Sequence, residues 1–153
     1  MASMMTSGSA MACSIPGKQW PTTAELAIAS DLVFIAHVER IRRMSPEDTK
    51  LMEAISSGNP PLNVAFLPPT HPADFSVLRV LKGTVPEHVL LQSAVQNCSG
   101  VHLEEGGDYL IFANRPSMAG DDIAPIKGSF KLDDSEYTQD ELRKVEFLFP
   151  SKR

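Results

Sequence analysis

The chain has 153 residues and a formal net charge of −5, with 42% hydrophobic and 22% charged residues. A chain of this length and composition is expected to form a single domain with its own core, which excludes wholesale disorder. The acidic balance disfavours a nucleic acid or an anionic membrane as the partner. No run reaches the roughly 18 apolar residues that a membrane span needs. Twelve prolines and nine glycines favour a β-rich domain over a helical bundle.

The two ends of the chain are expected to lie outside the domain. Residues 1–12 (MASMMTSGSAMA) are small, polar and Met-rich, and they lack the apolar stretch of a secretory signal. They are interpreted either as a native disordered tail or, as we favour, as a leader that replaces a removed signal peptide. The domain is predicted to cover residues 13–150, and residues 151–153 are expected to fray.

Taken in chain order, the first half predicts a helix, a long strand and an inserted helix. Thr22–Glu25 is a capping box that opens a short helix to Ala29. Leu32–Arg43 (LVFIAHVERIRR) has period-2 alternation, with Leu32, Phe34, Ala36 and Val38 on one face, and a strand this long is expected to curl around a small barrel. Ser45 before Pro46 predicts a helix over residues 46–56. The Pro-rich segment 59–72 is predicted to be an extended connector.

The second half predicts the remaining strands and a closing helix. Strands are expected at Phe75–Leu81, His88–Ser93 and Tyr109–Ala113, with a fifth in Ile123–Leu132 that Pro125 and Gly128 interrupt. A second capping box at Thr138–Glu141 is followed by apolar residues at helical spacing, which predicts an amphipathic helix over residues 138–149 that packs through Leu142, Val145 and Phe149. The predicted fold is mainly β: a small five-stranded antiparallel barrel with peripheral helices.

Motifs for catalysis, metals and cofactors are missing from the sequence. No CxxC, HExxH, GxSxG or Gly-rich phosphate loop occurs, so we predict no enzyme activity, metal site or cofactor. Cys98 and His102 could be written as a nucleophilic pair, but a buried or bridged cysteine beside a surface histidine is the favoured interpretation. The acidic pairs Asp121-Asp122 and Asp133-Asp134 are expected to be solvated loop carboxylates.

The two cysteines, Cys13 and Cys98, leave three interpretations open. They are two free buried thiols, partners in an intermolecular bridge, or one bridge that joins distant parts of the barrel. A bridge that closes so long a loop would stabilise the fold by about 4–5 kcal/mol in the chain-entropy model. Such bridges persist only in oxidising compartments.

An ordered set of motifs over residues 13–149 resembles the netrin-like (NTR) domain of tissue inhibitors of metalloproteinases. Its parts are the opening Cys13-Ser14-Ile15-Pro16, the strand start Ser30-Asp31-Leu32-Val33-Phe34, the segment FSVLRVLKG at 75–83, Asn97-Cys98-Ser99-Gly100, and GDYLIFA at 107–113. Ile15 stands where the animal inhibitors have a second cysteine. The pattern is therefore more similar to the pared-down TIMP-like domains of bacteria. The resemblance implies a five-stranded barrel of the OB type.

The resemblance also implies a disulfide and a binding ridge. It pairs Cys13 with Cys98, and it places the first cysteine's free α-amino group and carbonyl on the catalytic zinc of a protease. Ser14 would enter the specificity pocket, Ile15 and Pro16 would form the stem, and Gln96 and Asn97 would complete the ridge. A neutral amine and a carbonyl can replace the water in the open position of zinc. Because a peptide nitrogen is no ligand, the resemblance implies inhibition only when Cys13 is the first residue.

These observations predict a non-catalytic, extracytoplasmic protein-binding module. It would be secreted, periplasmic or cell-surface, monomeric and free of cofactors, and its most specific partner would be a zinc metalloprotease. The alternatives are an OB-fold that binds oligonucleotides, with Arg40, Arg42, Arg43 and Lys82 as its basic residues, or a structural protein of the cell envelope.

Overall fold

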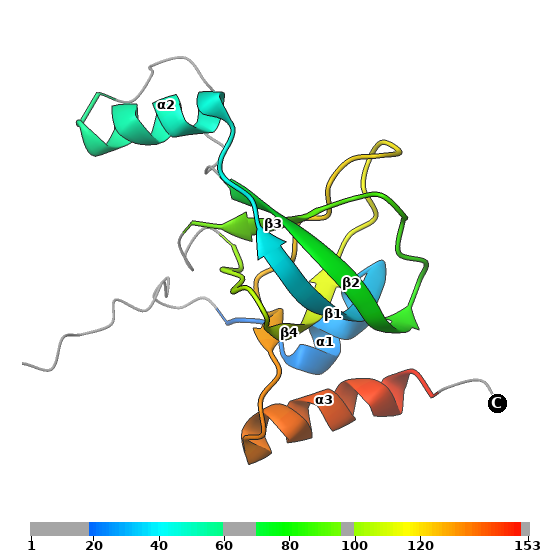
Figure 1. The fold of residues 1–153 in the computed structure, drawn as a ribbon. Helices are drawn as coiled ribbons and strands as arrows, with labels where there is room; N and C mark the ends of the chain where they lie inside the picture. The colour runs from blue at the N-terminus through cyan, green and yellow to red at the C-terminus, as the bar shows by residue number, and fades with distance from the viewer. Residues whose placement is uncertain (1–18, 60–69, 96–99, 151–153) are drawn as a thin grey trace, which may run out of the picture.

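The computed structural model describes residues 19–59, 70–95 and 100–150. In chain order, the elements are α1 (Thr23–Ala29), β1 (Leu32–Ile41), α2 (Pro46–Ser56), β2 (Thr70–Lys82), β3 (Leu91–Ala94), β4 (Asp108–Ala113), β5 (Phe130–Lys131) and α3 (Glu136–Leu148) (Figure 1). The α1, β1 and α2 segments begin at the predicted residues, because each has a local start signal: the Thr22–Glu25 capping box, period-2 alternation, and Ser45 before Pro46.

The strands form one antiparallel sheet with the order β3-β2-β1-β4-β5. The pairing of β1 with β2 shifts register at Val33/Phe34, Ile35/Ala36 and Val38/Arg40. Such bulges bend a strand and increase its twist. The sheet consequently curls into a half-barrel, and the fold also contains three helices, which confirms the predicted mainly-β, barrel-like fold.

A hydrophobic cluster lies on each face of the curled sheet, and β1 contributes to both. Its alternate residues Leu32, Phe34, Ala36 and Val38 lie in the inner core, as predicted, together with Leu91, Tyr109 and Ile111. Val33 points to the outer face, where it packs with Leu110 and Phe112 of β4 beneath Ala27 of α1 and Val145 of α3. The two clusters explain why β1 and β4 are so apolar: they are central strands of the sheet and are covered on both sides.

The segment between β4 and β5 links the two sides of the half-barrel. Ile123 forms a bridge with Leu91 of β3, and Pro125 forms one with Ala113 of β4. The predicted fifth strand, Ile123–Leu132, is wrong in extent. Only Phe130 and Lys131 form β5, because Pro125 lacks a backbone donor and Gly128 has a φ of 114°.

Other boundaries also differ from the prediction. Strand β1 ends at Ile41 rather than Arg43, and β3 starts at Leu91 rather than His88. Strand β2 begins at Thr70, inside the predicted connector, because its first residues pair with β3 and Pro72 lies opposite Gln92. Residues 60–69 of that connector lie outside the described part of the chain.

The start of α3 corrects the second predicted capping box. Ser135 is the N-cap, and its hydroxyl accepts a hydrogen bond from the backbone N–H of Thr138 at 3.3 Å. Thr138 is therefore a buried residue within the helix rather than its cap. The predicted packing of α3 is confirmed, since Val145 is fully buried and Leu142 and Phe149 pack against the outer-face cluster.

Helix α2 stands apart from the rest of the molecule, at the end of β1 (Figure 1). None of its residues is buried. Across the described ranges, no helix has both the length and the apolar character needed to cross a membrane.

Candidate protein-binding surface

The residues predicted for the ridge and the disulfide all fall in segments that the structure does not describe. They are Cys13, Ser14, Ile15, Pro16, Gln96, Asn97 and Cys98. The ridge and the bridge therefore stay predictions, and the described residues that flank them are the closest structural context.

The described residues that flank the two ridge segments share a neighbour, Lys127, on one side of the barrel. The Lys127 ammonium lies 4.5 Å from the centroid of the Trp20 ring, which anchors the chain just after the first ridge segment. Lys127 also lines a 350 Å³ hollow together with Gly100, Val101 and His102, which follow the second segment directly. The described chain ends that lead to the two segments lie on the same side in Figure 1. We call this feature the 100–131 hollow.

Charged and hydroxyl groups line the rest of the 100–131 hollow. The Lys131 ammonium lies 2.7 Å from a carboxylate oxygen of Glu104, and this hydrogen-bonded pair lowers the pKa of Glu104 and raises that of Lys131. The hydroxyl of Tyr109 accepts a hydrogen bond from the Glu104 backbone N–H at 3.0 Å, and burial raises the pKa of Tyr109. No sequence motif points to these residues, because Lys131 lies far along the chain from Glu104 and Tyr109.

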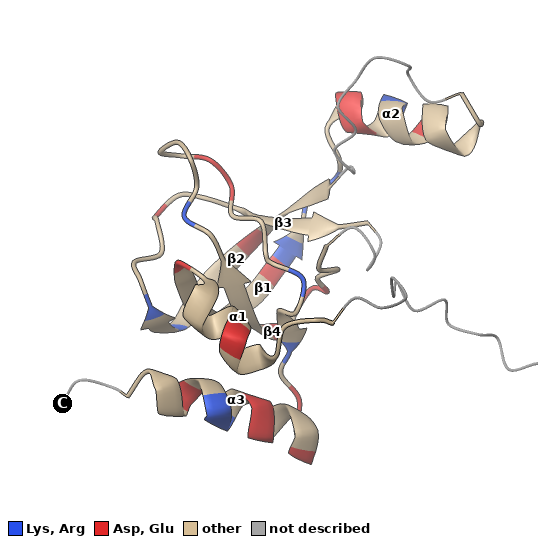
Figure 2. Cartoon of the chain, turned by 180° about the vertical axis from the view of Figure 1, so that it is seen from behind, with Lys and Arg blue, Asp and Glu red and all other residues tan. Residues whose placement is uncertain are grey.

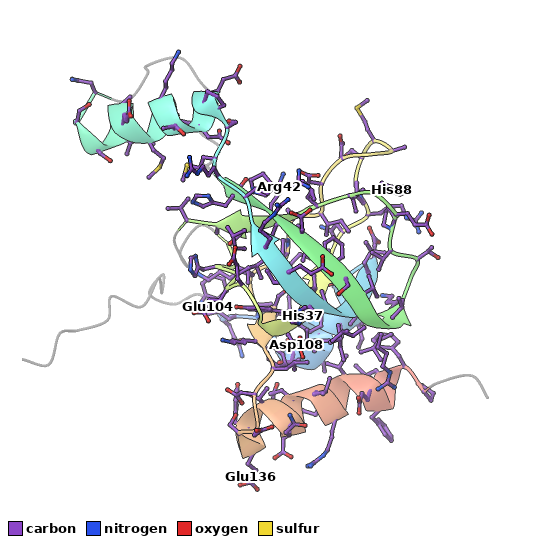
Figure 3. All side chains as sticks on the ribbon, viewed as in Figure 1. His37, Arg42, His88, Glu104, Asp108 and Glu136 are labelled. Carbon is purple, nitrogen blue, oxygen red and sulfur yellow. The ribbon has the colours of Figure 1, made fainter. Side chains whose placement is uncertain are left out.

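An apolar groove lies elsewhere on the half-barrel. It has a volume of about 550 Å³ and lies between β2 and the loop that follows it, lined by Phe75, Val77, Val80 and Val85 among others. His88, which lines this groove, and Glu104 of the 100–131 hollow lie at opposite sides of the molecule in Figure 3. The groove is therefore separate from the surface next to the ridge segments.

The acidic residues that were expected to be solvated lie in loops, where their carboxylates accept hydrogen bonds from backbone N–H groups. Asp121 accepts a hydrogen bond from the Met118 backbone N–H at 3.2 Å, and Asp122 accepts one from the Leu90 N–H at 3.2 Å. Both line a polar hollow of about 740 Å³ formed by residues 114–126 and Gln92. Asp133 binds Ser135 ahead of α3.

One row of side chains has the residue types of a catalytic triad. Register places Ser76 of β2 and Asp108 of β4 on either side of His37 of β1. His37 Nδ1 lies 2.6 Å from Asp108 Oδ1, and the two side chains are 39% and 46% exposed (Figure 3). Although all three residues are described, no hydrogen bond joins Ser76 to His37. We therefore interpret His37 and Asp108 as a hydrogen-bonded pair that links β1 and β4.

The basic residues of the nucleic-acid alternative are largely engaged within the protein. Arg42 and Arg40 both bind Asp74, with nitrogen–oxygen distances of 2.6 Å and 3.1 Å. Lys82 donates to the carbonyl oxygen of Ile28 at the end of α1, at 2.8 Å. Acidic and basic residues alternate along the ribbon in Figure 2, and α3 carries both. A phosphate backbone would need cations free of such partners.

Within the described ranges, no three histidine, cysteine or acidic side chains come together in a way that could hold a metal ion.

No family model and no curated protein matches the chain. The resemblance to the netrin-like domain therefore depends on the motifs at residues 13–149.

Proposed function

We propose that the chain is a non-catalytic, extracytoplasmic protein-binding module that acts through a ridge formed by residues 13–16 and 96–97. Its most specific form is inhibition of a zinc metalloprotease. In that form the α-amino group and carbonyl oxygen of Cys13 bind the protease zinc, and Ser14 enters the adjacent specificity pocket.

The convergence of the ridge flanks is the observation that carries this proposal. Trp20 and Gly100 lie on the same side of the barrel, because Lys127 is a neighbour of both. Cys13 is seven residues before Trp20, and Cys98 is two residues before Gly100. Seven residues of extended chain span about 23–25 Å, and this length supports the proposed bridge between the two cysteines. The barrel supplies a rigid base, as a binding loop requires.

The amino group at Cys13 provides the decisive experiment. Three forms are compared against a panel of zinc metalloproteases: the full chain, a chain that starts at Cys13, and that chain with one alanine added before Cys13. We expect only the Cys13-start form to inhibit, because only there is the chelating nitrogen an amine. Its inhibition should weaken as the pH falls below about 7.7–8.0, the α-amino pKa, because zinc binds the neutral amine.

A substitution next to the chelate separates pocket binding from zinc binding. Ser14→Gly in the Cys13-start form should weaken inhibition without abolishing it, because a pocket contact is lost and the chelate is kept. Inhibition by the full chain and the Cys13-start form to the same extent would disprove the chelate mechanism. Inactivity of the Cys13-start form across the whole panel would disprove inhibition and leave only the general binding module.

A further inference from the structure

We propose that the 100–131 hollow binds an acidic side chain of the protein partner, with Lys127 as the cation that receives the carboxylate. This inference deepens the proposed function and rests on it in one respect: the partner is a protein. It adds a specificity site beside the ridge, built entirely from residues that the structure describes.

The charges of the hollow favour a carboxylate. The chain carries a net charge of −5, yet this hollow is lined by Lys127, Lys131 and His102 and by a single acid, Glu104. Glu104 is already bound to Lys131 at 2.7 Å. Among the described residues, no carboxylate lies within the 4.0 Å ion-pair distance of Lys127, so its charge is left for a ligand.

Trp20 places Lys127 for this role. The ammonium lies over the indole face, 4.5 Å from the ring centroid, and the ring attracts the cation without neutralising it. Lys127 is half-buried, so water screens its charge less than at a fully exposed position. An ammonium held in one place binds a carboxylate with a smaller loss of side-chain entropy.

His102 supplies a second group at the edge of the hollow. Its Nδ1 donates a hydrogen bond to the carbonyl oxygen of Ala94 at 2.9 Å, which holds the ring in place. Nε2 is then the ring nitrogen that would contact a ligand. The backbone here lies directly after the second ridge segment. A partner that binds the ridge would therefore bring its neighbouring residues over the hollow.

The sole tryptophan gives a direct test that needs no protease. Trp20 is the only indole in the chain, so its fluorescence reports on Lys127 and the hollow. The full chain is titrated with the capped peptide acetyl-Gly-Gly-Glu-Gly-Gly-amide and with the same peptide carrying Gln in place of Glu. We expect a saturable fluorescence change with the Glu peptide only, and weaker binding as salt is added.

Substitutions of lysine residues test which cation binds the Glu peptide. Lys127→Gln should weaken binding of the Glu peptide at least about tenfold, as expected for loss of a charged hydrogen bond. Lys127→Arg should retain binding, and Lys50→Gln, which removes the same charge from exposed α2, should leave it unchanged. Thermal unfolding of each variant checks that the fold is intact.

The opposite results would overturn the inference. Equal responses to the Glu and Gln peptides, no response up to millimolar peptide, or unchanged binding by Lys127→Gln would each exclude a carboxylate site at Lys127. The assay is independent of protease inhibition. Inhibition by the Cys13-start form without peptide binding would overturn the hollow alone, and peptide binding without inhibition would support the hollow and disprove only the zinc chelate.

Discussion

Asp74 shows how single residues stabilise the end of the β1–β2 pair from which the chain leaves for α2. Its carboxylate accepts hydrogen bonds from Arg42 at 2.6 Å and 2.9 Å and from Arg40 at 3.2 Å. Mainly because of the Arg42 hydrogen bond, the pKa of Asp74 falls to about 2. These contacts join Arg40 of β1 and Arg42, just after it, to a β2 residue more than thirty positions away in the chain.

The lowered pKa of Asp74 predicts a loss of stability in acid. A folded-state pKa below the unfolded value means that the ionised carboxylate stabilises the fold at pH values above about 4, and that this contribution disappears as the pH falls towards 2. Titration of the Asp74 carboxyl carbon by NMR should give a midpoint near 2. Arg42→Gln should move the midpoint towards 3.8, whereas Arg43→Gln should not. An unchanged midpoint in Arg42→Gln would contradict the assigned cause.

Gly83, directly after β2, is predicted to tolerate no side chain. Its φ is 78°, and a Cβ at this position would lie 2.5 Å from the Asp31 carbonyl oxygen and 2.8 Å from Leu32 Cδ2. Gly83→Ala should therefore lower the free energy of unfolding by about 3 kcal/mol, from left-handed strain plus the clash. Gly106 has the same φ but open space around it, so Gly106→Ala should cost only about 1 kcal/mol. Equal losses in urea denaturation would mean that the close approach has no energetic effect.

At the scale of elements, α3 tests whether the terminal helix is part of the core. Val145 is fully buried against the outer face of the sheet, whereas Phe147 on the same helix is 87% exposed. Val145→Asp should lower the free energy of unfolding by about 3 kcal/mol or more, because it places a charge against apolar surface. Phe147→Asp should change it by less than about 0.5 kcal/mol. A similarly small effect of Val145→Asp in denaturant titrations would mean that α3 is not docked.

The α3 start also shows the limit of motif recognition within an element. Both Ser135 and Thr138 are good N-cap residues, and both stand three positions before a polar or acidic residue. The capping-box pattern favours Thr138, because Glu141 completes it. In the structure, Thr138 is buried and Ser135 caps the helix. Tertiary packing decided between two locally acceptable starts.

At the scale of the whole molecule, the predicted bridge between Cys13 and Cys98 would join the start of the chain to the segment after β3. Thiol titration of the denatured, unreduced protein should find no free sulfhydryl. Reduction should lower the free energy of unfolding by about 4–5 kcal/mol in the chain-entropy model. Two free thiols in protein produced under oxidising conditions would disprove both the bridge and the extracytoplasmic location.

Local patterns predicted α1, β1, α2 and the packing face of α3, because alternation, helical spacing and caps act within a few residues of one another. They could not predict the register shifts or the early start of β2, since each depends on a partner strand. They also missed the 100–131 hollow and its contact with Trp20, because Trp20, Gly100 and Lys127 belong to separate segments. Only folding of the barrel brings these residues together, because residues far apart in the sequence become neighbours on one side of the curled sheet.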